Sequence, residues 1–110
     1  MDKVNIADLT EEQISFQLIL HSGSARSKVI QALSEYRNEN TEGADDLIKQ
    51  AKQDLRAAHD IHFQMVKNEA GGNPTPLSLL LMHAEDHLMS TVTMKDLVQE
   101  LLELFKSRNL

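Results

Sequence analysis

Two imidazoles and two carboxylates stand within five residues, at His83, Glu85, Asp86 and His87. A helix turns by about 100° per residue, so His83 and His87 would share one face. Asp86 would lie to one side of His83, and Glu85 would point to roughly the opposite side. Because ionisable side chains among leucines cost free energy unless they have partners or work to do, this segment is the first candidate for a functional site.

A nucleophilic histidine is one chemistry that this spacing allows. Neutral imidazole attacks phosphorus readily and forms a labile phosphoramidate, which suits the relay of a phosphoryl group. Such a histidine needs one exposed ring nitrogen and a held orientation. His87, one turn after His83, would be placed to donate a hydrogen bond to the phosphoryl oxygens.

Zinc binding is the alternative chemistry. His83-x-x-Asp86-His87 is close to the inverted zinc-peptidase pattern H-x-x-E-H, and histidines at i and i+4 can chelate one Zn²⁺. Asp86 is one methylene shorter than the required glutamate, and no third ligand is evident, which disfavours a peptidase. His59 and His62 would be available to a structural zinc or two-metal bundle. Packed, hydrogen-bonded histidines are the more common role for such residues.

Composition narrows the class of protein. The chain has 110 residues, of which 41% are hydrophobic, enough for the core of a single domain spanning 1–110. Cysteine is absent, which excludes disulfides and thiol chemistry within the chain. A formal net charge of −6 argues against binding to nucleic acid.

Membrane and export signals are also missing. The longest apolar run, Leu79 to Met82, is far too short to cross a bilayer, so we expect no direct membrane insertion. The N-terminal residues lack a basic segment followed by an apolar one. We therefore expect a cytoplasmic location.

The chain predicts an all-α fold, an antiparallel three-helix bundle. The helices should span about 10–37, 41–70 and 75–107, because apolar residues recur there at helical spacing.

Local signals indicate where each helix begins and ends. Thr10 and Gln13 have capping-box spacing at the start of the first helix. Thr41 is expected to cap the second helix, which should end before Gly71-Gly72. Thr75 as the N-cap and Pro76 as the first helical residue should begin the third.

The second helix carries one apolar stripe, as expected for a helix packed on one side. The stripe consists of Ala44, Leu47, Ile48, Ala51, Leu55, Ala58, His62 and Met65. The third helix is apolar nearly all round, and two neighbours in a bundle cannot cover every face. We infer that it also forms a subunit interface, with help from Phe16, Ile19 and Leu20.

An interface on the third helix would give Asp86 a special position. Repeated by rotational symmetry, its carboxylate would meet its own copies, which raises the carboxylate pKa values or requires a cation. Mg²⁺ or another hard divalent cation prefers oxygen ligands and would bridge them. The alternative is a solvated acid on an exposed patch.

Several segments together resemble one known family. Leu80 to Thr91 is similar to the signature of the lactose/cellobiose-type enzyme IIA of the bacterial phosphoenolpyruvate-dependent sugar phosphotransferase system. His21 to Ser27, Ala32-Leu33 and Ala58-His59 match the same family, and the resemblance covers nearly the whole chain.

The resemblance implies a phosphotransferase component that works through a phosphohistidine. His83 would accept a phosphoryl group from the phosphorylated general phosphocarrier protein and pass it to a cysteine of the cognate enzyme IIB. The relay would drive uptake and phosphorylation of a β-linked disaccharide of the cellobiose, lactose or chitobiose type. The sequence does not say which, because the sugar binds the permease.

The resemblance also assigns the neighbours of His83. It implies a homotrimer in which Asp86 faces its symmetry mates and a metal ion on the axis, while His87 lies beside the phosphoryl group. Glu85 replaces the glutamine usual in the family, so a supporting role there is the least safely transferred. His21, His59 and His62 receive no role. A non-catalytic helical metal-binding or interaction module remains the alternative function.

Overall fold

The computed structural model describes residues 3–110, which form one short 3₁₀ helix and three long α-helices. The elements are η1 (Ile6–Asp8), α1 (Glu11–Arg37), α2 (Thr41–Ala70) and α3 (Leu79–Ser107). The described residues contain no strand, so the predicted all-α class is confirmed. Met1 and Asp2, which open the N-terminal segment without a signal-peptide pattern, lie outside the described residues.

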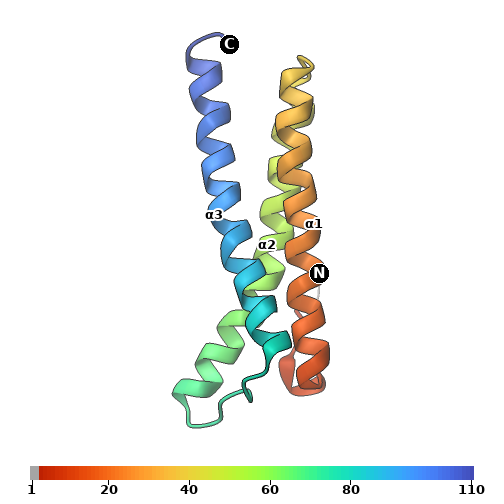
Figure 1. The fold of residues 1–110 in the computed structure, drawn as a ribbon, viewed down its shortest axis with the longest axis vertical. Coiled ribbons are helices and arrows are strands. Elements are labelled where there is room, and N and C mark those ends of the chain that lie inside the picture. The colour runs from red at the N-terminus through yellow and green to blue at the C-terminus, as the bar shows by residue number, and fades with distance from the viewer. Residues whose placement is uncertain (1–2) are drawn as a thin grey trace.

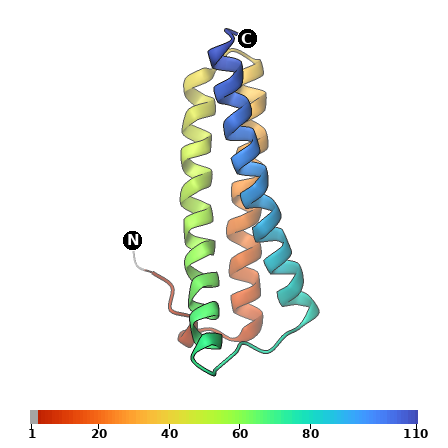
Figure 2. The same ribbon diagram turned by 90° about the vertical axis from the view of Figure 1, so that its left-hand side faces the viewer.

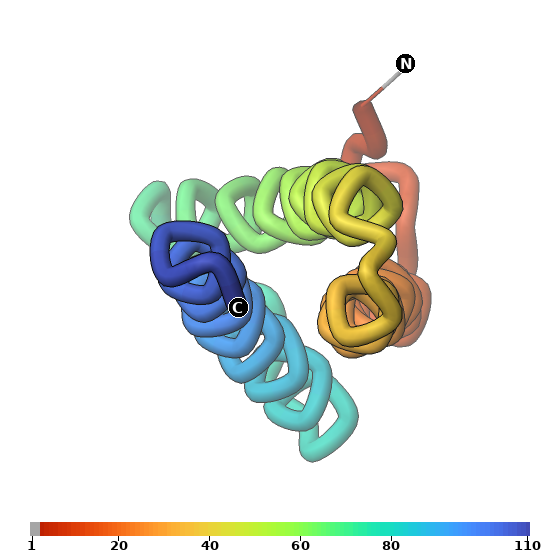
Figure 3. Tube along the Cα trace, turned by 90° about the horizontal axis from the view of Figure 1, so that it is seen from above, coloured from red at the N-terminus to blue at the C-terminus, as the bar shows by residue number. Residues whose placement is uncertain are grey.

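The three long helices run up, down and up along a rod whose axes measure 52 × 24 × 21 Å (Figures 1 and 2). Helix α1 packs along both α2 and α3, whereas α2 and α3 touch each other much less. Seen along the rod, the helices occupy the corners of a triangle (Figure 3). The position of α3 is therefore set mainly by its packing on α1.

Small and branched side chains fill the centre of the rod. Fully buried side chains on α1 and α3 include Leu18, Ala25, Val29 and Leu88. On α2 the predicted stripe is buried except for Leu47 and His62, which are half-buried, and Ile61 joins it. The alanines let the helices approach closely.

Polar contacts join the helices around this core. Asp54 of α2 accepts hydrogen bonds from Ser24 Oγ at 2.9 Å and from Lys28 Nζ at 2.7 Å, both on α1. Between α2 and α3, Lys106 of α3 lies 2.6 Å from Asp45 of α2. None of the helices within residues 3–110 is both long enough and apolar enough to cross a membrane.

The predicted capping box at the start of α1 is confirmed. Thr10 Oγ1 accepts a hydrogen bond from Gln13 N at 3.1 Å, and Gln13 Oε1 accepts one from Thr10 N at 2.9 Å. Both bonds lie within four residues, so the sequence determines them. The predicted end of α2 is confirmed as well, because Gly71 is its C-cap and Gly72 has a φ of 89°.

Helix α2 is capped one residue earlier than predicted, by Asn40 instead of Thr41. Asn40 Oδ1 accepts a hydrogen bond from Gly43 N at 3.1 Å, and its Nδ2 donates to Glu35 Oε2 at 2.8 Å. A Cβ at Gly43 would lie 2.3 Å from Asn40 Nδ2, so glycine makes room for this cap. Glu35 thus helps to hold the Asn40 side chain in the capping position.

Helix α3 begins at Leu79, so the predicted start at Thr75 and Pro76 is wrong. Ser78 is the N-cap, and its Oγ accepts a hydrogen bond from Leu81 N at 3.0 Å. The chain must cross the end of the bundle from α2 to α3 (Figure 2). Extended backbone advances about 3.3 Å per residue against about 1.5 Å in a helix, so the segment before Ser78 stays extended.

The assignment of Asn40 as the N-cap of α2 leads to a prediction about stability. Asn40→Ala should lower the free energy of unfolding by about 1 kcal/mol, because Gly43 N loses its acceptor. Thr41→Ala, at the exposed neighbouring position, is the matched control and should change it by less than about 0.5 kcal/mol. Urea unfolding followed by circular dichroism measures both, and a larger loss for Thr41→Ala would contradict the assigned cap.

Candidate functional site

His83 and His87 are stacked on one face of α3, as their spacing predicts. Their ring centroids lie 6.2 Å apart, and the ring planes are inclined by 8°. His83 is exposed and His87 is half-buried. An accessible imidazole thus stands beside a second one that the protein partly encloses, which is the arrangement a nucleophilic histidine needs.

Helix α1 passes close to this pair at Gly23. A Cβ at Gly23 would lie 3.6 Å from His87 Nε2, in ordinary van der Waals contact, and any longer side chain would extend into the space beside the ring. A small residue at this position lets α1 approach α3 closely. Gly23 therefore keeps space open next to His87.

Burial and nearby positive charge lower the pKa of His87. Desolvation is the largest cause, followed by the positive charge of Arg26 on α1 and by repulsion between the two imidazoles when both are protonated, while Asp86 partly opposes them. The lowered pKa of His87 favours the neutral form of the ring. A neutral ring carries one N–H donor, so His87 is able to donate one hydrogen bond to an anion beside His83.

Asp86 lies within a stripe of exposed apolar side chains along α3. Met82 is 53% exposed and Met89 is 44% exposed, and they flank Asp86 at spacings of four and three residues. Leu79, Leu97, Leu101 and Leu104 continue the exposed stripe. A solvent-facing stripe with steps of three and four is the pattern of a helix that packs on a partner helix.

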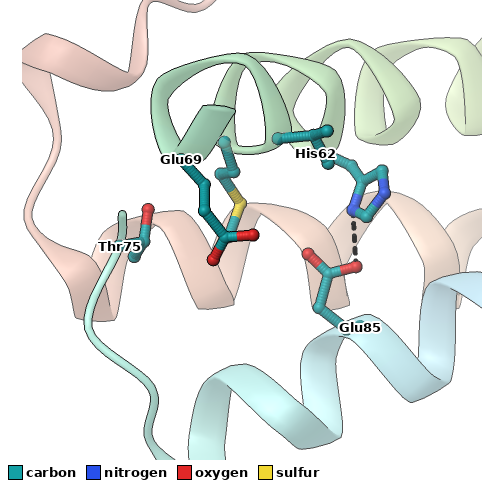
Figure 4. A pocket seen from close by; sticks show the side chains of 6 residues that line it. His62, Glu69, Thr75 and Glu85 are labelled. Carbon is teal, nitrogen blue, oxygen red and sulfur yellow. Dashed lines mark ion pairs between the residues drawn. The ribbon is translucent and has the colours of Figure 1, made fainter. Parts of the chain in front are cut away.

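Glu85 points away from the histidine pair, as its helical position predicts. Its Oε2 lies 2.6 Å from Nδ1 of His62 on α2, within ion-pair distance, and the contact does not have hydrogen-bond geometry (Figure 4). Both side chains are about one-quarter exposed, at 25% and 27%. Glu85 thus links α3 to α2, the two long helices that have the least contact with each other.

His62 and Glu85 line a cavity of about 160 Å³ between α2 and α3. The remaining lining residues are Met65, Val66, Glu69 and Thr75 (Figure 4). The single chain thus brings His83, His87 and Asp86 to one part of the surface but not Glu85. His62 is half-buried and contacts Glu85, but its Nδ1 has no hydrogen-bond partner within residues 3–110, so it is packed without being hydrogen-bonded there. His59 is exposed, so the expectation of a packed histidine is wrong for it; the two ring centroids lie 6.2 Å apart.

The described residues offer no ready metal cage within one chain. Residues 3–110 contain no group of three or more His, Cys, Asp or Glu side chains able to hold a metal ion. One carboxylate of Asp86 per chain fits a shared oxygen site only if several chains meet there.

The sequence analysis did not predict two features of the site. The partner of Glu85 depends on how α2 and α3 are rotated toward each other, and only the position of His62 on the apolar stripe hinted at it. The influence of Arg26 on His87 depends on the contact between α1 and α3. Gly23, three residues before Arg26, was the available signal.

Comparisons with known proteins agree with this geometry. Residues 13–106 match the family model "PTS system, Lactose/Cellobiose specific IIA subunit". The oligo-beta-mannoside-specific EIIA component of Bacillus subtilis strain 168 is 62% identical over 110 residues, covering 100% of both chains.

Solved structures give the same result. The cellobiose-specific enzyme IIA from Bacillus anthracis superposes with a TM-score of 0.85 at 40% identity, covering 96% of this chain and 97% of that one. The solution structure of a IIA(Chitobiose)–HPr complex contains a chain with a TM-score of 0.79 at 28% identity, covering 93% of this chain and 99% of that one. The protein belongs to the lactose/cellobiose-specific IIA family of the phosphotransferase system.

The His62–Glu85 pair predicts a measurable coupling between α2 and α3. Glu85→Gln should lower the free energy of unfolding by up to about 1 kcal/mol, because the amide keeps the shape but not the charge. A double-mutant cycle with His62→Gln should give a coupling energy of about 0.5 kcal/mol or more.

Glu69→Gln is the matched control for that cycle. Glu69 lines the same cavity but makes no ion pair within the described residues. Its combination with His62→Gln should be additive. Additive effects for Glu85→Gln and His62→Gln would show that the ion pair contributes nothing to stability.

Proposed function

We propose that the protein is the phosphocarrier subunit of a sugar phosphotransferase system and that His83 carries the phosphoryl group. The observation that supports this most directly is the stacked pair, in which the ring centroids of exposed His83 and half-buried His87 lie 6.2 Å apart. His83 would accept the group from the phosphorylated general phosphocarrier protein. It would then pass the group to a cysteine of the cognate enzyme IIB.

Each transfer exchanges one bond to phosphorus for another. A lone pair on a ring nitrogen of neutral His83 forms the new N–P bond as the N–P bond of the donor phosphohistidine breaks. The proton on the other nitrogen of each ring stays in place, so the donor leaves as neutral imidazole. In the next step a cysteine thiolate forms an S–P bond while the N–P bond at His83 breaks and its electrons return to the ring.

His87 and Glu85 contribute differently to this proposal. His87 would donate an N–H to a phosphoryl oxygen, and burial together with the positive charge of Arg26 lowers its pKa and favours the neutral ring. Glu85, held by His62 on the opposite side of α3, would not repel the incoming phosphoryl group. We therefore expect the rate of phosphoryl acceptance to be unchanged by Glu85→Gln.

The relatives support the assigned partners and the type of sugar. One structural neighbour was solved in complex with HPr, a relative of the donor expected here. The relative that is 62% identical bears the name oligo-beta-mannoside-specific, and a structural neighbour is named cellobiose-specific. A β-linked disaccharide or short oligosaccharide is therefore the proposed cargo of the system. A cytoplasmic location belongs to the same proposal.

A homotrimer is the proposed assembly, with α3 at its centre. The exposed stripe that includes Met82 and Met89 would be buried by packing around a threefold axis. Three copies of Asp86 would then meet, and Mg²⁺ or another divalent cation would neutralise them. When bound, the cation would supply charge balance at the interface.

The alternative, a non-catalytic metal-binding or interaction module, lacks comparable support. Within the part of the chain that is described, no three potential ligands gather for a metal. An interaction module would not need the stacked histidine pair.

The first functional prediction concerns His83. With phosphoenolpyruvate, enzyme I and the general phosphocarrier protein, the wild type should gain one acid-labile, base-stable phosphoryl group per chain. His83→Ala should abolish the mass increase while circular dichroism stays unchanged, and His87→Ala should be labelled more slowly. Normal labelling of His83→Ala would refute the assignment.

The second functional prediction concerns assembly. Light scattering at micromolar concentration should give a trimer for the wild type, and a chelator should weaken it. Asp86→Leu should remain trimeric in chelator, because it removes the clustered charge and adds apolar surface. Asp46→Leu, at an exposed position on α2, is the matched control and should retain the chelator sensitivity. A monomer in every case would refute both the interface and the metal site.

A further inference from the structure

The positive charge of Arg26, on α1, acts on His87 of the histidine pair. No Asp or Glu forms an ion pair with Arg26 within residues 3–110, whereas Lys28, two residues further on, is paired with Asp54. Its side chain is exposed. Among the groups whose charge acts on His87, Arg26 is the one that comes from another helix. A free guanidinium is therefore available at this point of the surface.

The packing of α1 on α3 explains how the charge of Arg26 acts on His87. The two helices run in the same direction (Figures 1 and 2), and Gly23 is level with His87 because a Cβ there would lie 3.6 Å from Nε2. Arg26 follows one turn later on a neighbouring part of the same face. Helical side chains lean toward the N-terminus, which brings the guanidinium back toward the level of His87.

The chemistry of phosphoryl transfer gives this guanidinium a use. The transferred group spreads negative charge over three oxygens in the transition state. Arginine presents a planar fork of N–H donors that matches phosphoryl oxygens and stays charged at all relevant pH values. In a chain with a net charge of −6, an anion approaching His83 needs such local compensation.

We propose that Arg26 binds the phosphoryl oxygens as the group moves to and from His83. This inference rests on the proposed function. Arg26 makes and breaks no covalent bond and keeps its protons. It donates N–H hydrogen bonds to the oxygens from the α1 side, while His87 donates from α3. The close approach of α1 to α3 at Gly23 brings these two donors to the same region.

Single-turnover phosphorylation of the full-length protein tests the proposal. The donor is the phosphorylated general phosphocarrier protein, and both the maximal rate and the half-saturating donor concentration are measured. Arg26→Gln should lower the maximal rate by roughly tenfold or more, as expected for loss of a charge-assisted hydrogen bond in the transition state. Arg26→Lys should recover part of the rate, since it keeps the charge but not the fork.

Arg37→Gln is the matched control, because it removes the same charge from the same helix about 16 Å away along its axis. It should leave both parameters unchanged. Thermal unfolding of each variant shows that the fold is retained, and Arg26→Lys provides a second folded variant.

The possible outcomes separate this inference from the proposed function. If the wild type is labelled and Arg26→Gln matches its maximal rate, the phosphoryl-binding role of Arg26 is wrong while the phosphocarrier function stands. A raised half-saturating concentration with an unchanged maximal rate would also overturn it, since Arg26 would then only dock the donor. If the wild type is not labelled, the proposed function is wrong and this inference fails with it.

Discussion

The packing of α3 on α1 is the contact on which the site depends. Helices α2 and α3 touch little, so α1 carries α3 and fixes how its histidines face the surface. Where Gly23 meets His87, α1 lies close enough to the His87 ring to enclose it partly, while the neighbouring His83 stays exposed. The lowered pKa of His87 and the effect of the Arg26 charge on it both follow from this contact.

The packing of α3 between α1 and α2 also places negative and positive groups on different sides of α3. The side facing α2 holds the carboxylate of Glu85 against His62, and the side near α1 holds the histidine pair with Arg26. A phosphoryl anion at His83 would therefore meet cationic and neutral donors, with Asp86 as the nearby carboxylate. In the proposed trimer a cation would offset the charge of Asp86. The acidic residues that give the chain its net charge of −6 thus need not oppose the transfer.

Local patterns in the sequence predicted the helices well. The capping box of Thr10 and Gln13 and the glycines after α2 act within a few residues, so the sequence determines them. The choice between Asn40 and Thr41 failed, and a side chain five residues earlier helps to hold Asn40 in the capping position. The prediction that α3 starts at Thr75 and Pro76 failed, and the helix begins at Leu79. The connection must first cross the end of the bundle, and no local pattern in the sequence records that distance.

The candidate site, like the fold, could be predicted from the sequence only in part. The shared face of His83 and His87 follows from helical spacing, and the structure confirms it. The pairing of Glu85 with His62 depends on the rotation of one helix against another. The stripe around Asp86 could be recognised as apolar, but its exposure on the single chain could be known only from the packing of α3.

The most direct test is nuclear magnetic resonance of the phosphorylated wild-type protein with ¹⁵N-labelled histidines. The account predicts a nitrogen–phosphorus coupling at one ring nitrogen of His83 and changed ring resonances for His87. It also predicts unchanged resonances for His62, which is held by Glu85 on the other side of α3. A coupling at any other histidine, or at none, would contradict the account.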